Sequence, residues 1–150
     1  MVDVAMILER LKKLAEYVEF LNQKKTLSLE EFLKDRGTQL AVERALQLAI
    51  QVVVDIATHI LATTSNKMPQ DYADAVINLA EVGVIPVSFA RKIEGMPRFR
   101  NVLVHEYVDI DSKRVYQNMQ EELDDFDLFG RYIKEWLDKQ GLLNPPELKS

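Results

Sequence analysis

The best candidates for catalytic residues in this sequence are an arginine and a histidine five positions apart, Arg100 and His105. The guanidinium of Arg100 is a planar fork that matches two phosphate oxygens, and the imidazole of His105 can move protons near neutral pH. Such a pair can cleave a phosphodiester without a metal ion, because one group transfers protons and the other stabilises the charge that develops on phosphate. In RNA the attacking group is the 2′-hydroxyl, so the protein need supply no nucleophile.

The helical wheel separates these two groups on a single straight helix. Residues advance by about 100° per position, so Arg100 shares a face with Tyr107, whereas Asn101 shares a different face with His105. We therefore expect either that the helix ends near His105 or that a second copy of the chain completes the site across a two-fold axis. Asn101 is predicted to orient the imidazole or the substrate.

A cluster of cations lies directly before this pair, at Arg91, Lys92 and Arg98, with only Glu94 of opposite charge among them. The formal net charge of the whole chain is −5, and nucleic-acid binding depends largely on neutralising phosphates. We therefore predict that RNA contacts come from this local basic patch, although such clusters are often only a solvated face.

The elements that must position these residues all show helical patterns. Apolar residues recur at helical spacing over residues 4–21. Ser28 and Glu31 have the spacing of a capping box, and Gly37 is predicted to end the short helix that follows. Residues 39–64 are apolar around most of their circumference, so this segment is predicted to be the central helix of the fold.

Further helices are expected over 69–83, with Tyr72 inward, over 87–94, closed by Gly95, and from Pro97 onward. One long amphipathic helix is predicted over 115–137. It is expected to be capped by Asp111 or Ser112, weakened by Gly130 and ended by Gly141.

A narrow polar stripe at Gln51, Asp55 and His59 interrupts the central helix at i, i+4 spacing. Such spacing can hold a metal ion, but two histidines without a dense carboxylate cluster make a polar seam the better interpretation, and no metal or cofactor is predicted. Asp55 is also a candidate to reach across the bundle and tune His105.

Together these patterns predict an all-α fold, an up-down bundle of about four long helices plus short ones. Residues 1–143 are expected to form one domain and residues 144–150 a frayed tail. The chain has no cysteine, which excludes disulfides and thiolate chemistry. Polar residues interrupt the apolar stretch 46–60, so it is predicted to be buried rather than to span a membrane, and the protein to be cytoplasmic.

Residues 98–107, Arg-Phe-Arg-Asn-Val-Leu-Val-His-Glu-Tyr, resemble the R-x4-H-x-Y signature of HEPN-domain toxins of the HepT type, in its RN-x-LVH-x-Y form. The resemblance implies a HEPN-like homodimer, with a composite ribonuclease site formed by Arg100 and His105 of both chains. It also implies a partner, a minimal nucleotidyltransferase antitoxin, which silences the toxin by attaching AMP to Tyr107.

Two other interpretations remain open at this stage. The chain can be a non-catalytic helical module that serves a nucleotidyltransferase as substrate or scaffold, or a purely structural bundle in which the Arg-Asn-His-Tyr set is coincidence. The acidic run within residues 121–127 is expected to be a solvated helix face, although it can also serve a basic partner.

Overall fold

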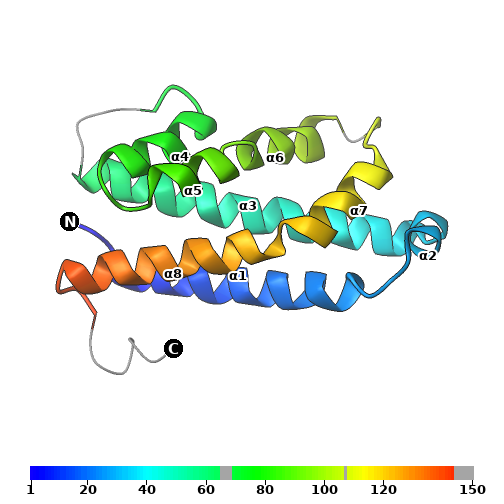
Figure 1. The fold of residues 1–150 in the computed structure, drawn as a ribbon, viewed down its shortest axis with the longest axis horizontal. Coiled ribbons are helices and arrows are strands. Elements are labelled where there is room, and N and C mark those ends of the chain that lie inside the picture. The colour runs from blue at the N-terminus through cyan, green and yellow to red at the C-terminus, as the bar shows by residue number, and fades with distance from the viewer. Residues whose placement is uncertain (65–68, 107, 144–150) are drawn as a thin grey trace.

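The computed structural model describes residues 1–64, 69–106 and 108–143, and within these ranges it contains eight α-helices and no strand (Figure 1). The predicted all-α fold is thus confirmed. The helices are α1 (Val4–Lys24), α2 (Leu29–Lys34), α3 (Arg36–Thr64), α4 (Tyr72–Glu81), α5 (Val87–Ile93), α6 (Met96–His105), α7 (Ser112–Glu121) and α8 (Leu123–Lys139).

Helix α3 is the central element, as predicted. It packs against α1, α2, α4, α6, α7 and α8, because apolar side chains cover most of its circumference. In Figure 1, α1 and α8 lie side by side below α3, and α4 to α6 cover its other flank. By length and composition α3 is also long and apolar enough to cross a membrane, but 61% of its most apolar window is buried inside the protein, as expected of a core helix.

The capping box at the start of α2 is formed as predicted: Glu31 N–H donates to Ser28 Oγ at 3.1 Å, and Ser28 N–H donates to Glu31 Oε1 at 3.0 Å. The expectation that Gly37 ends this helix was wrong. Asp35 accepts from the N–H and the hydroxyl of Thr38, so it caps a new helix and Gly37 lies in the first turn of α3.

Gly95 follows directly after Glu94, the C-cap residue of α5, as predicted for the glycine that closes this helix. Helix α5 ends at Ile93, and Gly95 is the N-cap of α6, with Pro97 in the first turn. Helix α4 starts at Tyr72 rather than at residue 69, because the Asp71 carboxylate accepts from the backbone N–H of Asp74 at 2.8 Å.

The long helix predicted over 115–137 is two helices, α7 and α8, which meet at Glu122. Acidic side chains are close together at this junction, where the charges of Asp125 and Glu121 both raise the pKa of Glu122. The break places Asp124 and Asp125 in the first turn of α8, where carboxylates interact favourably with free backbone N–H groups. Asp111 caps α7, one of the two residues predicted for that position.

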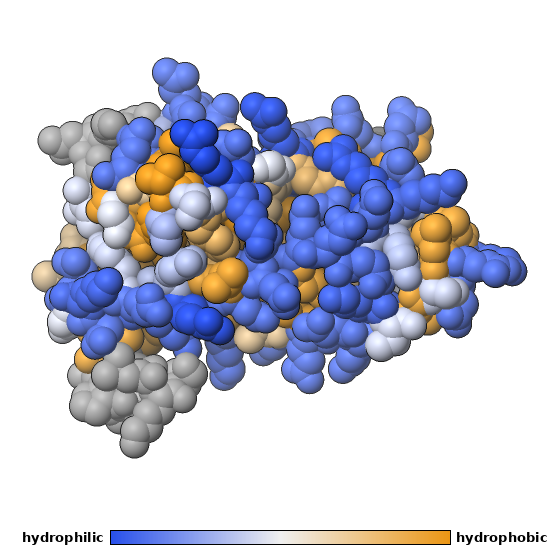
Figure 2. All heavy atoms as spheres, in the orientation of Figure 1, coloured by the Kyte–Doolittle hydropathy of each residue, from blue (hydrophilic) through white to orange (hydrophobic). Residues whose placement is uncertain are grey.

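Hydrophilic side chains cover most of the face in Figure 2, with smaller hydrophobic areas between them. The predicted tail at 144–150 lies outside the described residues, and the division into one domain and a tail stays a prediction.

Candidate active site

Helix α6 carries the candidate catalytic residues and ends at His105. The buried side chains of Met96, Phe99 and Leu103 hold one face of α6 in the core, and α6 packs against α3 and α4. Glu106 N–H still donates to Val102 O at 3.0 Å, but Glu106 itself has left the helical conformation. The expectation that the helix ends near His105 is therefore confirmed.

The end of α6 removes the basis for placing Tyr107 on the same face as Arg100, because that argument assumed a helix continuing to residue 107. Tyr107 itself lies outside the described residues. Its predicted modification stays a prediction.

Arg100 is half-buried and is held by three neighbours. Its Nε donates to Gln51 Oε1 on α3 at 2.9 Å, and its Nη1 donates to Asn101 Oδ1 at 3.1 Å. The guanidinium carbon lies 5.6 Å from the ring centroid of Tyr72, at the start of α4, within the range of a cation–π interaction. Three different segments of the chain therefore fix this guanidinium.

The polar stripe on α3 extends the contacts of Arg100 to α1, through Gln51 and Asp55. Gln51 Nε2 donates to Asp55 Oδ1 at 2.8 Å, and Asp55 Oδ2 lies 3.6 Å from Nε of Arg10 on α1. The stripe is thus a polar seam, as predicted. The expectation that Asp55 tunes His105 was wrong: in the described residues Asp55 contacts Gln51, which in turn accepts from Arg100, and no hydrogen bond or ion pair joins Asp55 to His105.

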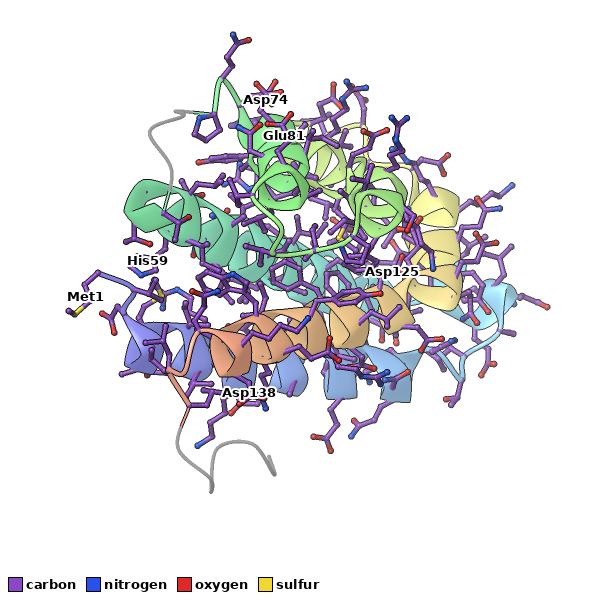
Figure 3. The ribbon with its side chains drawn as sticks, turned by 60° about the vertical axis from the view of Figure 1, so that its left-hand side comes forward. Met1, His59, Asp74, Glu81, Asp125 and Asp138 are labelled. Atoms are coloured by element: carbon purple, nitrogen blue, oxygen red, sulfur yellow. The ribbon has the colours of Figure 1, made fainter. Side chains whose placement is uncertain are left out.

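His59, the third member of the stripe, has a separate role. Its Nε2 accepts from the backbone N–H of Asp3 at 2.9 Å, and in Figure 3 it lies beside the N-terminal segment. Within the described residues, no group of three or more histidines, cysteines or carboxylates could hold a metal ion.

His105 and Asn101 are both exposed. The structure joins Asn101 to Arg100 rather than to the imidazole, and the imidazole of His105 makes no hydrogen bond within residues 1–64, 69–106 and 108–143. Arg100 and His105 diverge by about 140° around the helix. The former reaches inward to α3, while the latter faces solvent, as the helical wheel predicted.

The three residues of the basic patch have different surroundings in the fold. Arg91 and Arg98 are exposed, but Lys92 Nζ lies 2.8 Å from Oδ1 of the buried Asp125 on α8. The hydrogen bond to Asp125 and its charge raise the pKa of the Lys92 ammonium. Lys92 is thus engaged within the fold, and Arg91 and Arg98 remain as the freely exposed members of the patch.

Sequence reasoning missed Tyr72 and Arg10, and it noted Gln51 without assigning it to Arg100. Tyr72 was expected to point inward, but 41% of its surface is exposed. The i, i+4 spacing of Gln51 and Asp55 was a usable signal for the polar stripe. No pattern in the sequence indicates that Arg100, 49 positions later, joins this stripe.

Comparison with known proteins confirms the family that the motif resembles. The family described as "Ribonuclease HepT-like" matches residues 7–133. A tRNA nuclease HepT from Aphanizomenon flos-aquae is 31% identical over 136 residues, which cover 91% of this chain and 92% of the relative. An mRNA nuclease HepT from Shewanella oneidensis is 30% identical over 104 residues, covering 69% of this chain and 78% of the relative.

Solved structures show the same fold. A tri-AMPylated HEPN toxin of Shewanella oneidensis, in complex with the MNT antitoxin, is 26% identical with a TM-score of 0.77, covering 86% of this chain and 96% of that chain. The cytosolic protein YutE of Bacillus subtilis is 17% identical with a TM-score of 0.83, covering 95% and 96%. The second likeness concerns the fold alone.

Proposed function

Because this chain belongs to the HepT-like ribonuclease family, we propose that it is the toxin of a toxin–antitoxin pair and an endoribonuclease that needs no metal ion. The observation that carries the proposal is the fixed guanidinium of Arg100 on the helix that ends at His105. The relatives named as tRNA and mRNA nucleases support RNA as the substrate class.

In the proposed reaction, the 2′-oxygen of RNA forms a bond to phosphorus while the bond to the 5′-oxygen breaks. His105 accepts the proton of the 2′-hydroxyl, and the 5′-oxygen takes up a proton as it leaves. Arg100 stabilises the negative charge on the phosphate oxygens in the transition state. The products are a 2′,3′-cyclic phosphate and a 5′-hydroxyl.

The proposed site is composite, because one chain presents Arg100 and His105 in different directions. A two-fold axis beside the end of α6 would bring the arginine of one copy towards the histidine of the other. We propose a homodimer of this kind, acting in the cytoplasm, with Asn101 as a supporting residue and Arg91 and Arg98 as RNA contacts.

Regulation is proposed to come from a nucleotidyltransferase antitoxin that transfers AMP to Tyr107. The AMPylated Shewanella toxin in complex with its MNT antitoxin supports this pairing. An AMP group attached two positions after His105 in the sequence adds a bulky negative charge beside the motif, and its phosphate can pair with arginine.

Cleavage of RNA by the purified protein in excess EDTA tests the proposal. We expect wild-type protein to yield fragments with 2′,3′-cyclic phosphate ends. We expect Arg100→Ala and His105→Ala to lose at least about 100-fold in rate with unchanged helical content. The Arg44→Ala variant, at an exposed arginine on α3 to which no RNA contact is assigned, is the control and should keep most of the activity.

Equal cleavage by wild type and both motif variants would refute the catalytic assignment. No cleavage by any variant, together with binding of a nucleotidyltransferase partner that survives His105→Ala, would favour the non-catalytic module instead. Mass spectrometry of protein co-expressed with its partner tests Tyr107: additions the size of AMP should disappear in Tyr107→Phe.

A further inference from the structure

Two residues outside the proposed catalytic set, Gln51 and Tyr72, contact the guanidinium of Arg100 from different sides. We propose that Gln51 and Tyr72 are positioning residues, which fix the guanidinium of Arg100 so that its remaining N–H groups meet the phosphate without further ordering. The inference rests on the proposed ribonuclease function and adds the residues that prepare its phosphate-binding group.

Gln51 is suited to this role because its amide is held in one orientation. Arg100 Nε can only donate, so the amide oxygen of Gln51 must face it, at 2.9 Å. The amide nitrogen then faces Asp55, whose carboxylate can only accept when ionised, at 2.8 Å. A flipped amide would lose both bonds, so Asp55 keeps the acceptor of Gln51 directed at Arg100.

Asp55 is in turn held between two helices. Its other carboxylate oxygen lies 3.6 Å from Arg10 Nε on α1, and both side chains are partly exposed. Such a pair contributes little to stability, so its consequence is orientation. The row Arg10, Asp55, Gln51, Arg100 connects α1 through α3 to the guanidinium on α6.

Tyr72 restrains the guanidinium of Arg100 at the face of the aromatic ring, whereas Gln51 restrains it at Nε. The guanidinium carbon lies 5.6 Å from the centroid of its ring, and a cation over an aromatic face is attracted by about 0.5–1 kcal/mol at exposed sites. Tyr72 is the first residue of α4 and directly follows the Asp71 cap, which fixes where its backbone lies relative to Arg100.

These contacts leave part of the guanidinium available. Of its five N–H groups, two donate to Gln51 and Asn101, and the other three have no partner in the described part of the chain. Holding a charged group in place before substrate arrives lowers the cost of ordering it in the transition state, so that its stabilisation of the developing charge is fully available to the reaction.

The first measurement of this proposal does not depend on activity. In a ¹H–¹⁵N spectrum we expect the Arg100 Nε–H signal, identified by its loss in Arg100→Lys, to exchange slowly with water. Gln51→Met keeps the length of the side chain but not the acceptor, and should return this exchange to that of a free arginine. Gln47→Met, one turn earlier on α3 and also half-buried, should leave it unchanged.

The second measurement is cleavage kinetics. We expect Gln51→Met to lower the single-turnover cleavage rate by about 10- to 100-fold, with little change in the RNA concentration for half-saturation and in melting temperature. Tyr72→Leu should act in the same direction, and Tyr72→Phe, which keeps the ring, should restore the rate. In Arg100→Ala the further change Gln51→Met should have no additional effect, because Gln51 acts only through Arg100.

The outcomes separate the two proposals. If wild-type protein does not cleave RNA, the proposed function fails, and the exchange of Nε–H still decides whether Gln51 fixes Arg100. If wild type cleaves but Gln51→Met keeps both its rate and its slow exchange, the positioning role is overturned. Additive losses in the double variant would also overturn it, since they would assign Gln51 an effect independent of Arg100.

Discussion

Two carboxylates three positions apart, Glu122 and Asp125, have different electrostatic surroundings. Asp125 is 4% exposed and forms an ion pair with Lys92 of α5. Figure 3 shows Asp125 on the side of α8 that faces α5. Glu122, at the junction of α7 and α8, is exposed, but neighbouring groups partly desolvate its carboxylate. That desolvation, followed by the charges of Asp125 and Glu121, raises its pKa, against the weaker opposing effects of Arg114 and Lys92.

This shift predicts the effect of Glu122→Gln on stability. Because the pKa of Glu122 is higher in the folded state, the folded protein binds this proton more tightly, and ionisation of Glu122 costs stability once the pH exceeds the raised pKa. Glutamine resembles the protonated form, so we expect the variant to be more stable at neutral pH. The gain should be below about 1 kcal/mol, because the carboxylate is partly solvated and screened.

Thermal melts between pH 3 and pH 8 check this expectation. The advantage of Glu122→Gln should shrink as the pH falls through the raised pKa and vanish below 4.5, the ordinary value for glutamate. Glu9→Gln, on the exposed face of α1, serves as the control. An advantage that persists unchanged at pH 3 would mean that packing, rather than charge, separates the two proteins.

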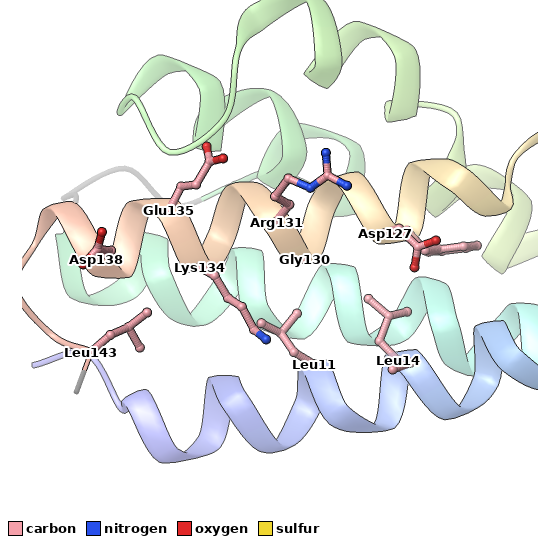
Figure 4. A pocket seen from close by; sticks show the side chains of 11 residues that line it. Leu11, Leu14, Asp127, Gly130, Arg131, Lys134, Glu135, Asp138 and Leu143 are labelled. Carbon is pink, nitrogen blue, oxygen red and sulfur yellow. The ribbon is translucent and has the colours of Figure 1, made fainter. Parts of the chain in front are cut away.

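At the scale of elements, α8 contains a glycine in its interior, opposite α1. A groove of about 550 Å³ runs between these helices, lined by Leu11 and Leu14 from α1 and by Gly130, Arg131 and Lys134 from α8, among others (Figure 4). A Cβ added at Gly130 would lie 3.7 Å from Leu11 Cδ2, an ordinary van der Waals distance. The structure therefore has room for alanine at this position.

We expect Gly130→Ala to stabilise the protein by about 0.5–1 kcal/mol, because alanine loses less backbone entropy than glycine when it joins a helix. Chemical denaturation measures this change. Gly141→Ala is the opposite case: Gly141 has φ +70°, where a side chain is strained, so this variant should lose stability. A loss in Gly130→Ala would show that α1 and α8 cannot accept the added methyl group.

Helices with strong periodicity could be predicted from the sequence, whereas the places where they end depended on contacts across the fold. The central position of α3 followed from its apolar circumference, and the Ser28 capping box from local spacing. The break at Glu122 could not be predicted, because the apolar pattern continues through it, whereas the pairing of Asp125 with Lys92 acts between elements. Gly37 was misplaced for a related reason, because the Asp35 side chain caps a new helix immediately before it.

The same division applies to the candidate site. Arg100 and His105 and their divergence could be predicted, because residue type and helical geometry are local properties. The partners of Arg100 could not, because Gln51 and Tyr72 lie 49 and 28 positions away and are brought together only by packing of α3, α4 and α6.

At the scale of the whole molecule, the divergence of Arg100 and His105 leads to a test of the composite site. If a working site takes its arginine from one chain and its histidine from the other, the Arg100→Ala and His105→Ala homodimers are both inactive. A heterodimer of the two variants contains one site with both groups intact. We therefore expect mixed, unfolded and co-refolded variants to recover activity that neither variant has alone.

The size of this recovery is limited by chain statistics. Random pairing makes about half of the dimers mixed, and each mixed dimer has one intact site of two, so activity should reach at most about a quarter of wild type. Co-refolding each variant with itself controls for refolding losses, and RNA cleavage in EDTA is the readout. If mass spectrometry finds mixed dimers but the mixture stays inactive, the pairing of one arginine with the partner's histidine is refuted. Each site would then need both groups from one chain, or all four groups of the dimer together.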